Sequence, residues 1–254
     1  MIETFHLGKN FGSVRAVVDL NLQTKPGEIF GFLGPNGAGK TTTIKLITGL
    51  LRPSSGRVVV GGVDVVKNPV EAKKILAYVP DQPQLYGKLT VEEFLKFIGA
   101  VYRMDSKSCQ QGIGNFLELF GFADKRWELI ESLSHGTKQK VALAAAFLHE
   151  PKVLLLDEPL VGLDPRSARI LKDLLRQYAK RGATIFLSTH ILEVAERMCD
   201  RVGIINKGEL VALGAAEELK SKTGQEGESL EDLFLELTGG LEETEVLKFL
   251  GEQG

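Results

Sequence analysis

The residue types between Gly34 and Thr42 are those needed to bind a phosphate group. The segment fits the pattern G-x-x-x-x-G-K-T. Glycines lack side chains, so successive backbone N–H groups can turn inward around a phosphate. Lys40 supplies a point charge for outer phosphates, and the Thr41 hydroxyl can ligate magnesium. The candidate nucleotide-binding residues of this loop are Gly34, Pro35, Asn36, Gly37, Ala38, Gly39, Lys40, Thr41 and Thr42.

Two acids, Asp157 and Glu158, end an apolar run further along the chain. A strand that leaves the core for solvent often ends in acidic residues. Without other evidence, Asp157 and Glu158 would be interpreted as such a strand end with no function. With a phosphate loop upstream, the pattern instead indicates the second half of a phosphate-loop ATPase site. Asp157 would then hold magnesium, directly or through water, and Glu158 would polarise the attacking water.

Two aromatic side chains have two interpretations each. His190 ends a β-branched run, and a strand end in an open parallel sheet faces the ligand crevice. A lone histidine there can equally cap a helix or lie on the surface. Phe11 lies beside Gly12 in the turn-rich segment 9–13. It can stack on a planar base, or it can fold into the core, and its position in the sequence favours neither.

Strands and a helix must position these groups. The phosphate loop lies between a predicted buried strand, Ile29–Leu33, and a predicted helix over Ile44–Leu50, the context in which the motif is a credible site. The other predicted strands are Ile2–Leu7, Ala16–Leu22, Arg57–Val60, Ile75–Val79, Lys152–Asp157 and Thr184–Thr189, with a closing hairpin of Val202–Ile205 and Leu210–Leu213.

Helical patterns dominate the middle of the chain. Thr90 and Glu93 form a capping box before apolar residues at helical spacing. A second helix is predicted to close at Gly121, and a third covers Val141–Leu148. Three helices without a strand, in a chain otherwise rich in strands, predict an inserted helical subdomain.

Two further helical patterns lie later in the chain. One covers Arg166–Tyr178. The acidic end of the chain carries an apolar stripe over Leu230–Leu237 and a possible second over Leu241–Leu250. Such a stripe usually docks on its own domain, and a face for a partner is the alternative.

Composition limits the class of protein. The 254 residues are 43% hydrophobic and 25% charged, with a net charge of −2, so we expect no nucleic-acid partner. Cys109 and Cys199 are far apart and indicate free thiols in a reducing compartment. No run approaches the roughly 20 apolar residues of a membrane span, and Met1–His6 lacks a signal-peptide pattern. We therefore expect a cytosolic protein that reaches a membrane only through a partner.

The full set of motifs resembles the nucleotide-binding subunit of ATP-binding cassette (ABC) transporters. Besides the phosphate loop and the acidic strand end, the set includes Leu133–Thr137, Gly162–Pro165 and Ser188–His190, and the resemblance covers nearly the whole chain. It implies an α/β fold: a phosphate-loop ATPase core of mixed and parallel sheet, an antiparallel N-terminal β-subdomain and an inserted helical subdomain. The expected cassette covers residues 1–220, with the helical subdomain at about 83–150, and residues 221–254 form an acidic helical tail.

The resemblance also implies roles for single residues, with ATP and Mg²⁺ as cofactors. Phe11 would stack on adenine, Asp157 would hold magnesium with Thr41, and Glu158 would position the water. His190 would sense the γ-phosphate. The signature residues are Ser134 and Gly136, which would bind the nucleotide of a facing subunit, and Asp164 would couple the two sites of a head-to-tail dimer.

The sequence departs from the family pattern in three places. Asp81 occupies the position of a common glutamine, with Gln82 beside it; an acid there could reach magnesium or its water. The signature has His135 and Thr137 where glycine and glutamine are common. Leu160 and Val161 replace a small polar pair. None of these changes removes the residues expected to hydrolyse ATP.

The expected function is ATP hydrolysis that drives a separate multi-span permease, with the chain on the inner face of the cell membrane. Its partner cassette would be itself or a homologue, and the groove for the permease would lie beside the helical subdomain and residues 81–82. The residues 231–239 resemble the end of cassettes that serve exporters. A soluble ABC ATPase of an assembly or repair system is the alternative, and a non-catalytic ATP-binding regulator is a third.

Overall fold

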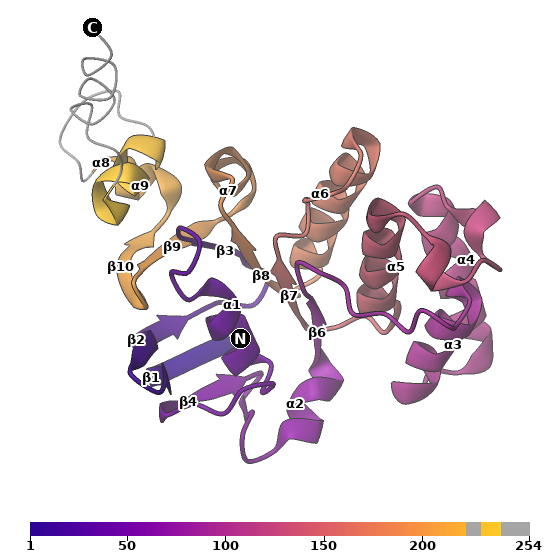
Figure 1. The fold of residues 1–254 in the computed structure, drawn as a ribbon, viewed down its shortest axis with the longest axis horizontal. Coiled ribbons are helices and arrows are strands. Elements are labelled where there is room, and N and C mark those ends of the chain that lie inside the picture. The colour runs from indigo at the N-terminus through magenta and orange to yellow at the C-terminus, as the bar shows by residue number, and fades with distance from the viewer. Residues whose placement is uncertain (222–229, 240–254) are drawn as a thin grey trace, which may run out of the picture.

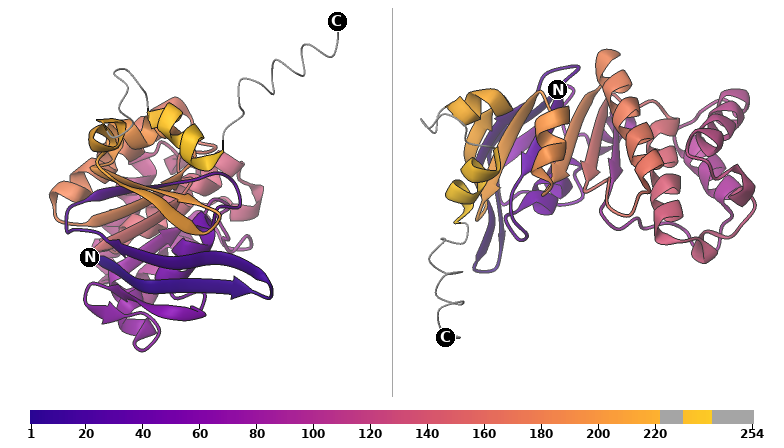
Figure 2. Two further views of the ribbon diagram at one scale, coloured as in Figure 1. Left: turned by 90° about the vertical axis from the view of Figure 1, so that its left-hand side faces the viewer. Right: turned by 90° about the horizontal axis from the view of Figure 1, so that it is seen from above.

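The protein is described here by a computed structural model over residues 1–221 and 230–239. It is elongated, with a four-stranded sheet at one end and the helices of residues 91–148 at the other (Figures 1 and 2). A six-stranded sheet lies between them and carries the phosphate loop.

The four-stranded sheet is antiparallel, in the order β2-β1-β4-β5. The predicted link at residues 9–13 is shorter than expected, because Phe11 pairs with Val14 and only two residues turn. Gly12 takes φ of 58°, which glycine adopts without strain, so both strands continue to the tip of the hairpin. The strands are β1 (Ile2–Phe11), β2 (Val14–Gln23), β4 (Ser55–Val60) and β5 (Val63–Asp64).

The six-stranded sheet is mixed, in the order β10-β9-β3-β8-β7-β6. All neighbours are parallel except β10 and β9, which form the predicted hairpin. Since carboxyl ends of parallel strands meet at one side of a sheet, the ends of β3, β7 and β8 lie together there. The strands are β3 (Ile29–Leu33), β6 (Leu76–Val79), β7 (Val153–Asp157), β8 (Thr184–Thr189), β9 (Arg201–Asn206) and β10 (Glu209–Gly214).

The helices predicted within the described residues are confirmed, including the three of the middle segment. Thr90 and Glu93 make both hydrogen bonds of the capping box, and Gly121 follows the second helix with φ of 67°. Three short helices, α2 (Pro69–Ile75), α7 (Leu192–Met198) and α8 (Ala216–Ser221), were not predicted. The remaining helices are α1 (Lys40–Ile47), α3 (Val91–Val101), α4 (Ser106–Leu119), α5 (His135–Leu148), α6 (Pro165–Lys180) and α9 (Leu230–Thr238), with 3₁₀ turns at Ala123–Lys125 and Ile130–Ser132.

Alternate residues of the central strands serve two separate cores. On β7, Leu154 and Leu156 pack with helices α3–α6, whereas Val153 and Leu155 pack with α1 and the four-stranded sheet. A third, smaller core joins β9 to helices α7–α9. Both faces of the sheet are therefore covered, which explains why these strands are continuous apolar runs.

The C-terminal stripe docks on its own domain where the structure describes it. Leu230 and Leu233 of α9 are buried against α7, α8 and β9. The possible second stripe, Leu241–Leu250, lies outside the described residues. Among the helices of residues 1–221 and 230–239, none has the length and apolar character needed to cross a bilayer. Both cysteines are free thiols, as predicted.

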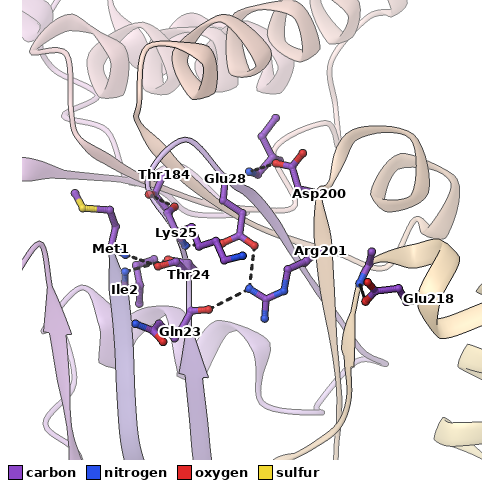
Figure 3. Close-up of polar contacts among 12 residues, drawn as sticks. Met1, Ile2, Gln23, Thr24, Lys25, Glu28, Thr184, Asp200, Arg201 and Glu218 are labelled. Carbon is purple, nitrogen blue, oxygen red and sulfur yellow. Dashed lines mark hydrogen bonds and ion pairs between the residues drawn. The ribbon is translucent and has the colours of Figure 1, made fainter.

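A cluster of polar contacts joins the two sheets at the amino ends of the parallel strands (Figure 3). Glu28 is buried, and its two oxygens accept from Arg201 at 3.0 Å and from the Lys25 N–H at 2.6 Å. Asp200 accepts from the Ile29 N–H at 2.8 Å. This cluster fixes the start of β3 and therefore the strand that leads into the phosphate loop.

Candidate functional site

The phosphate loop connects β3 to α1 as predicted. Gly37 and Gly39 have φ of 81° and 111°, in the region that favours glycine. A Cβ on Gly34 would lie 2.4 Å from the Ile205 carbonyl oxygen, and one on Gly39 would lie 2.4 Å from the Ala16 carbonyl oxygen. The loop thus packs on backbone of β9 and β2 with no room for side chains at these two points.

Lys40 is buried within the loop. Its Nζ donates to the carbonyl oxygens of Gly34 at 2.6 Å and Pro35 at 3.2 Å. Burial lowers the pKa of the lysine, and the negative charges of Glu158 and Asp157 partly oppose that shift. In the described part of the chain Lys40 forms no ion pair, so its charge is held close to the carboxylates without being neutralised by one.

Thr41, Asp157 and Ser188 form a hydrogen-bonded row across three elements. The Thr41 hydroxyl donates to Asp157 Oδ2 at 2.7 Å, and the Ser188 hydroxyl donates to Asp157 Oδ1. Asp157 and Ser188 are directly opposite in the β7–β8 pairing, so strand register brings them together. Two of the three predicted magnesium ligands are therefore in contact.

Glu158 and His190 meet at the same side of the sheet. Glu158 Oε1 lies 2.8 Å from His190 Nδ1, whereas Glu158 Oε2 is buried and has no hydrogen-bond partner among the described residues. Glu158 has φ of 50°, unusual for a residue other than glycine, and its N–H donates to the Ser188 carbonyl at 3.0 Å. The carboxylate is therefore oriented by one partner while its second oxygen is left available.

A cavity of about 440 Å³ connects the loop to the carboxylates. Asp81 also lines this cavity, so the third predicted magnesium ligand shares the space with the other two. The lining residues are Val14, Arg15, Ala16, Asn36, Gly37, Gly39, Lys40, Thr41, Thr42, Asp81, Asp157, Glu158 and Lys207.

The donor set fits a phosphate chain with a magnesium ion. Hydroxyl and carboxylate oxygens, such as those of Thr41 and Asp157, are the ligands that magnesium prefers. Within the described residues no group of three or more His, Cys, Asp or Glu could hold a metal alone. A cation here would need phosphate oxygens to complete its coordination, which is how magnesium usually binds in nucleotide sites.

The signature residues lie outside this cavity. Ser134 caps the N-terminus of α5, and its hydroxyl accepts from the Thr137 N–H at 3.3 Å. A Cβ on Gly136 would lie 2.6 Å from the Gly162 carbonyl oxygen, so this position tolerates only glycine. Asp164 caps α6 and pairs with Lys140 of α5 at 2.8 Å. The start of α5 is thereby attached to the loop that follows Glu158.

Phe11 and His190 are also absent from the cavity lining. Phe11 ends β1 at the hairpin tip with 48% of its surface exposed, and the Lys9 ammonium lies 5.1 Å from the ring centre. Phe11 does not fold into the core, so the alternative of a buried phenylalanine is excluded. Its exposed face is compatible with base stacking.

Four polar or backbone contributors to the site were not assigned a role from sequence. Ser188 belonged to a quoted motif but had no role, although its strand register with Asp157 could have indicated one. Arg15, Ala16 and Lys207 belong to no motif, and only the folding of β2 and the β9–β10 turn against the loop brings them to the cavity.

Comparisons with known proteins agree with this geometry. A sequence model of a protein family described as "ABC transporter" matches residues 17–161. The probable multidrug ABC transporter ATP-binding protein YbhF of Escherichia coli is 38% identical over 240 residues, which are 93% of this chain. The chain spans only 41% of the length of YbhF. The linearmycin resistance ATP-binding protein LnrL of Bacillus subtilis is 37% identical over 88% of this chain and 72% of its own.

Solved structures give the same result. A structure described as the ATP-binding subunit of an ABC transporter aligns with a TM-score of 0.89 and 34% identity, covering 93% of this chain and 99% of that one. A dimeric post-hydrolysis state of the ATP-binding cassette MJ0796, bound to ADP and Pi, aligns with a TM-score of 0.77 and 25% identity. That alignment covers 85% of this chain and 98% of the other.

Proposed function

The chain belongs to the ABC transporter family, and from this premise we propose that it binds and hydrolyses ATP to drive a separate membrane permease. The observation that carries the hydrolytic role is the Glu158 carboxylate. One oxygen is held by His190, and the other is buried without a partner. A carboxylate oriented in this way can accept a proton from an attacking water.

The proposed magnesium ligands are Thr41 and Asp157, with Asp81 close enough to reach the ion or its water. When bound, magnesium would supply positive charge to the phosphate oxygens. Ser188 keeps Asp157 oriented, and Lys40 contributes the charge for the outer phosphates. The cavity lining, which joins these residues to the loop, supports this assignment.

The proposed active form is a head-to-tail dimer with itself or a homologous cassette. Ser134 and Gly136 lie at the N-terminus of α5, where unpaired N–H groups favour an anion, yet they are outside this chain's own cavity. A facing subunit would bring its nucleotide to them. The MJ0796 structure, described as dimeric, supports this arrangement by similarity.

The proposed permease site is a groove of about 610 Å³ between the sheet and helices α3 and α5. Leu50, Tyr78, Phe94 and Tyr102 give it an apolar lining. Thr41, Asp81 and Asp157 line both this groove and the nucleotide cavity. Leu50, in this lining, has 56% of its surface exposed. A permease segment seated here would lie close to residues that also face the nucleotide.

An exporter is the proposed type of transporter, because relatives are named for multidrug transport and linearmycin resistance. The protein would then lie in the cytoplasm on the inner face of the cell membrane, held there by its permease. We propose that the chain divides into a cassette over residues 1–220, with a helical subdomain at about 83–150, and a tail over residues 221–254.

The substitution Glu158→Gln tests the catalytic assignment. We expect a 10²- to 10⁴-fold lower kcat with ATP binding retained, since general base catalysis contributes about that factor. We also expect ATP to convert the variant to dimers, measured by size-exclusion chromatography. Glu150→Gln is a matched control, because Glu150 is an exposed glutamate with the same unusual φ. Hydrolysis by Glu158→Gln at the wild-type rate would contradict the role.

A second experiment tests the permease groove. Leu50→Asp should reduce binding of the chain to membranes that contain its permease, without changing its ATP affinity, because Leu50 is an exposed residue of the groove lining. Trp127→Asp is the control, because Trp127 has 68% of its surface exposed and is absent from the groove lining. Equal membrane binding by both variants would exclude the groove, and binding only to soluble proteins would favour an assembly or repair ATPase.

A further inference from the structure

We propose that Arg15 and Lys207 form a cationic rim on the nucleotide cavity that binds the phosphate nearest the ribose. Neither residue belongs to a motif, and both line the cavity with the phosphate loop. The inference rests on the proposed function, since it assumes that a nucleotide occupies this cavity.

Lys207 is held at the cavity by its neighbour Gly208. The Gly208 N–H donates to the Ala38 carbonyl at 2.9 Å, and the Gly208 carbonyl accepts from the Val18 N–H at 2.8 Å. Gly208 is buried and has φ of 85°, and a Cβ there would lie 3.0 Å from the Ala16 carbonyl oxygen. The β9–β10 turn therefore joins the phosphate loop to β2, and this keeps the backbone of Lys207 beside the cavity.

The contacts between β2, the phosphate loop and Gly208 also position Arg15. It lies directly before Ala16, whose carbonyl oxygen contacts both Gly39 and Gly208. Its partner in the β1–β2 pairing is Asn10, the residue before Phe11. Arg15 therefore lies on β2 between the hairpin tip and the point where the strand contacts the phosphate loop.

The order of groups along β2 identifies the phosphate. Phe11 pairs with Val14 at the tip, and Ala16 contacts the loop, so the two ends are separated by about 6–7 Å of strand. A nucleotide with its base on Phe11 and its outer phosphates in the loop must pass Arg15 between them. Arg15 would therefore meet the phosphate attached to the ribose, whereas Lys40 serves the outer phosphates.

Both cations are available for a ligand. In the described part of the chain neither side chain makes an ion pair or a hydrogen bond, and both are exposed. The cavity also contains three carboxylates, of Asp81, Asp157 and Glu158. A phosphate chain would add negative charge to a cavity that already contains these three carboxylates. Lys40 alone cannot balance this charge, and Arg15 and Lys207 supply two further positive charges. Arginine suits this role because its guanidinium can bind a phosphate through two N–H groups.

The test measures ATP, ADP and AMP affinity of the full chain by calorimetry, with EDTA present to remove any effect of magnesium. We expect Arg15→Ala and Lys207→Ala each to weaken binding by about 5- to 20-fold. The factor should be the same for all three nucleotides, because the phosphate involved is common to them. Raising the salt concentration should weaken wild-type binding more steeply than binding by the variants.

Two kinds of control separate charge from structure. Arg169→Ala and Lys107→Ala remove exposed cations on α6 and α4 that do not line the cavity, and affinities should stay within about two-fold of wild type. Arg15→Lys and Lys207→Arg keep the charge and should retain affinity within about three-fold. If these conservative variants lose as much affinity as the alanine variants, packing and not charge is responsible, and the inference is wrong.

The remaining outcomes distinguish this inference from the proposed function. A wild-type chain that binds no adenine nucleotide, even with magnesium, overturns the proposed function. A wild-type chain that binds ATP, with alanine variants at the rim as tight as the Arg169→Ala and Lys107→Ala controls, overturns the rim alone. An effect on ATP that is absent for AMP would assign the rim to an outer phosphate and contradict the proposed order along β2.

Discussion

The six-stranded sheet has buried charged side chains at both ends of its parallel strands, and the two ends differ in how these charges are satisfied. At the amino ends, both oxygens of Glu28 have partners, one of them Arg201. At the carboxyl ends, Lys40 has no ion pair among the described residues and Glu158 Oε2 has no partner. Buried polar groups are nearly always paired in proteins.

The difference separates a structural end from a functional one. A closed set of contacts stabilises the protein by itself, as in Figure 3. Groups without partners, such as Lys40 and Glu158 Oε2, stay available for a ligand but lower the stability of the protein. Such a cost in stability is common at functional sites. Substitutions at the two ends should therefore affect different measurements, in the order given by the following predictions.

The largest effect on stability is expected from Arg201→Ala. The substitution leaves Glu28, with 5% of its side chain exposed, without its cation. We expect the free energy of unfolding in urea to fall by about 2–4 kcal/mol, somewhat below a fully buried pair because Arg201 is 26% exposed. ATP affinity should change less than two-fold. Arg197→Ala, which breaks an exposed pair with Glu193, should cost less than about 0.5 kcal/mol.

At the carboxyl end, Lys40→Met should give the opposite profile. We expect ATP affinity to fall by about 10- to 100-fold, as for the loss of a charged hydrogen bond. Without nucleotide, the free energy of unfolding should change by less than about 1 kcal/mol, since a buried unpaired cation is removed. A large loss of stability in Lys40→Met would mean that this end is as closed as the other.

The same variant makes a prediction about pH. Burial lowers the pKa of Lys40 below its ordinary value of 10.5, so between the two values the unfolded chain binds more protons than the folded one. Stability gained from this residue therefore rises with pH in that window. Lys40→Met should lack this gain, which can be measured by urea unfolding of both proteins at successive alkaline pH values.

A smaller effect is expected from Asp81→Gln, which restores the residue common in the family. Removing one carboxylate from the cavity should raise the magnesium concentration that half-saturates ATP binding by about 2- to 5-fold, the range of an exposed charge interaction. Asp124→Asn, at an exposed acid in the helical region, is the control. No change in Asp81→Gln would mean that Asp81 does not reach the ion.

The smallest effect is expected from Asp164→Asn, at an ion pair with Lys140 that lies near the open end. Lys140 and the Ser167 N–H hold the pKa of Asp164 well below its ordinary value of 3.8. Its contribution is present above about pH 4 and is lost as the pH falls below that value. Asparagine keeps the helix cap, so we expect a loss of about 0.5 kcal/mol at pH 7, reduced by solvent screening. The difference from wild type should shrink in acid.

Local sequence was sufficient to predict the elements that carry the site. The phosphate loop, the capping box at Thr90 and the buried strands each depend on neighbours within a few residues, so the pattern predicts them directly. The short helices α2 and α7 have only seven residues each, too few for a clear periodicity. The tight turn at Gly12 was also missed. The apolar pattern of the first strand ends at Leu7, whereas the strand itself continues to Phe11.

Contacts between distant segments could not be predicted in the same way. The hydrogen bond from Ile29 to Asp200 joins residues 171 apart in sequence. The approach of Lys207 to the loop depends on the packing of Gly208 between two other segments. The candidate residues within motifs were found from sequence, whereas Arg15 and Lys207 became visible only with the fold.

The close approach of Gly136 to Gly162 has a mechanical consequence. The two backbones are close, with no side chain between them, so a relative movement would either produce a clash or lose these contacts. The Lys140–Asp164 pair adds a second attachment a few residues away. We therefore expect a rotation of α5 to displace residues 162–164 with it. A spin label at an exposed position of that loop would report the movement of α5.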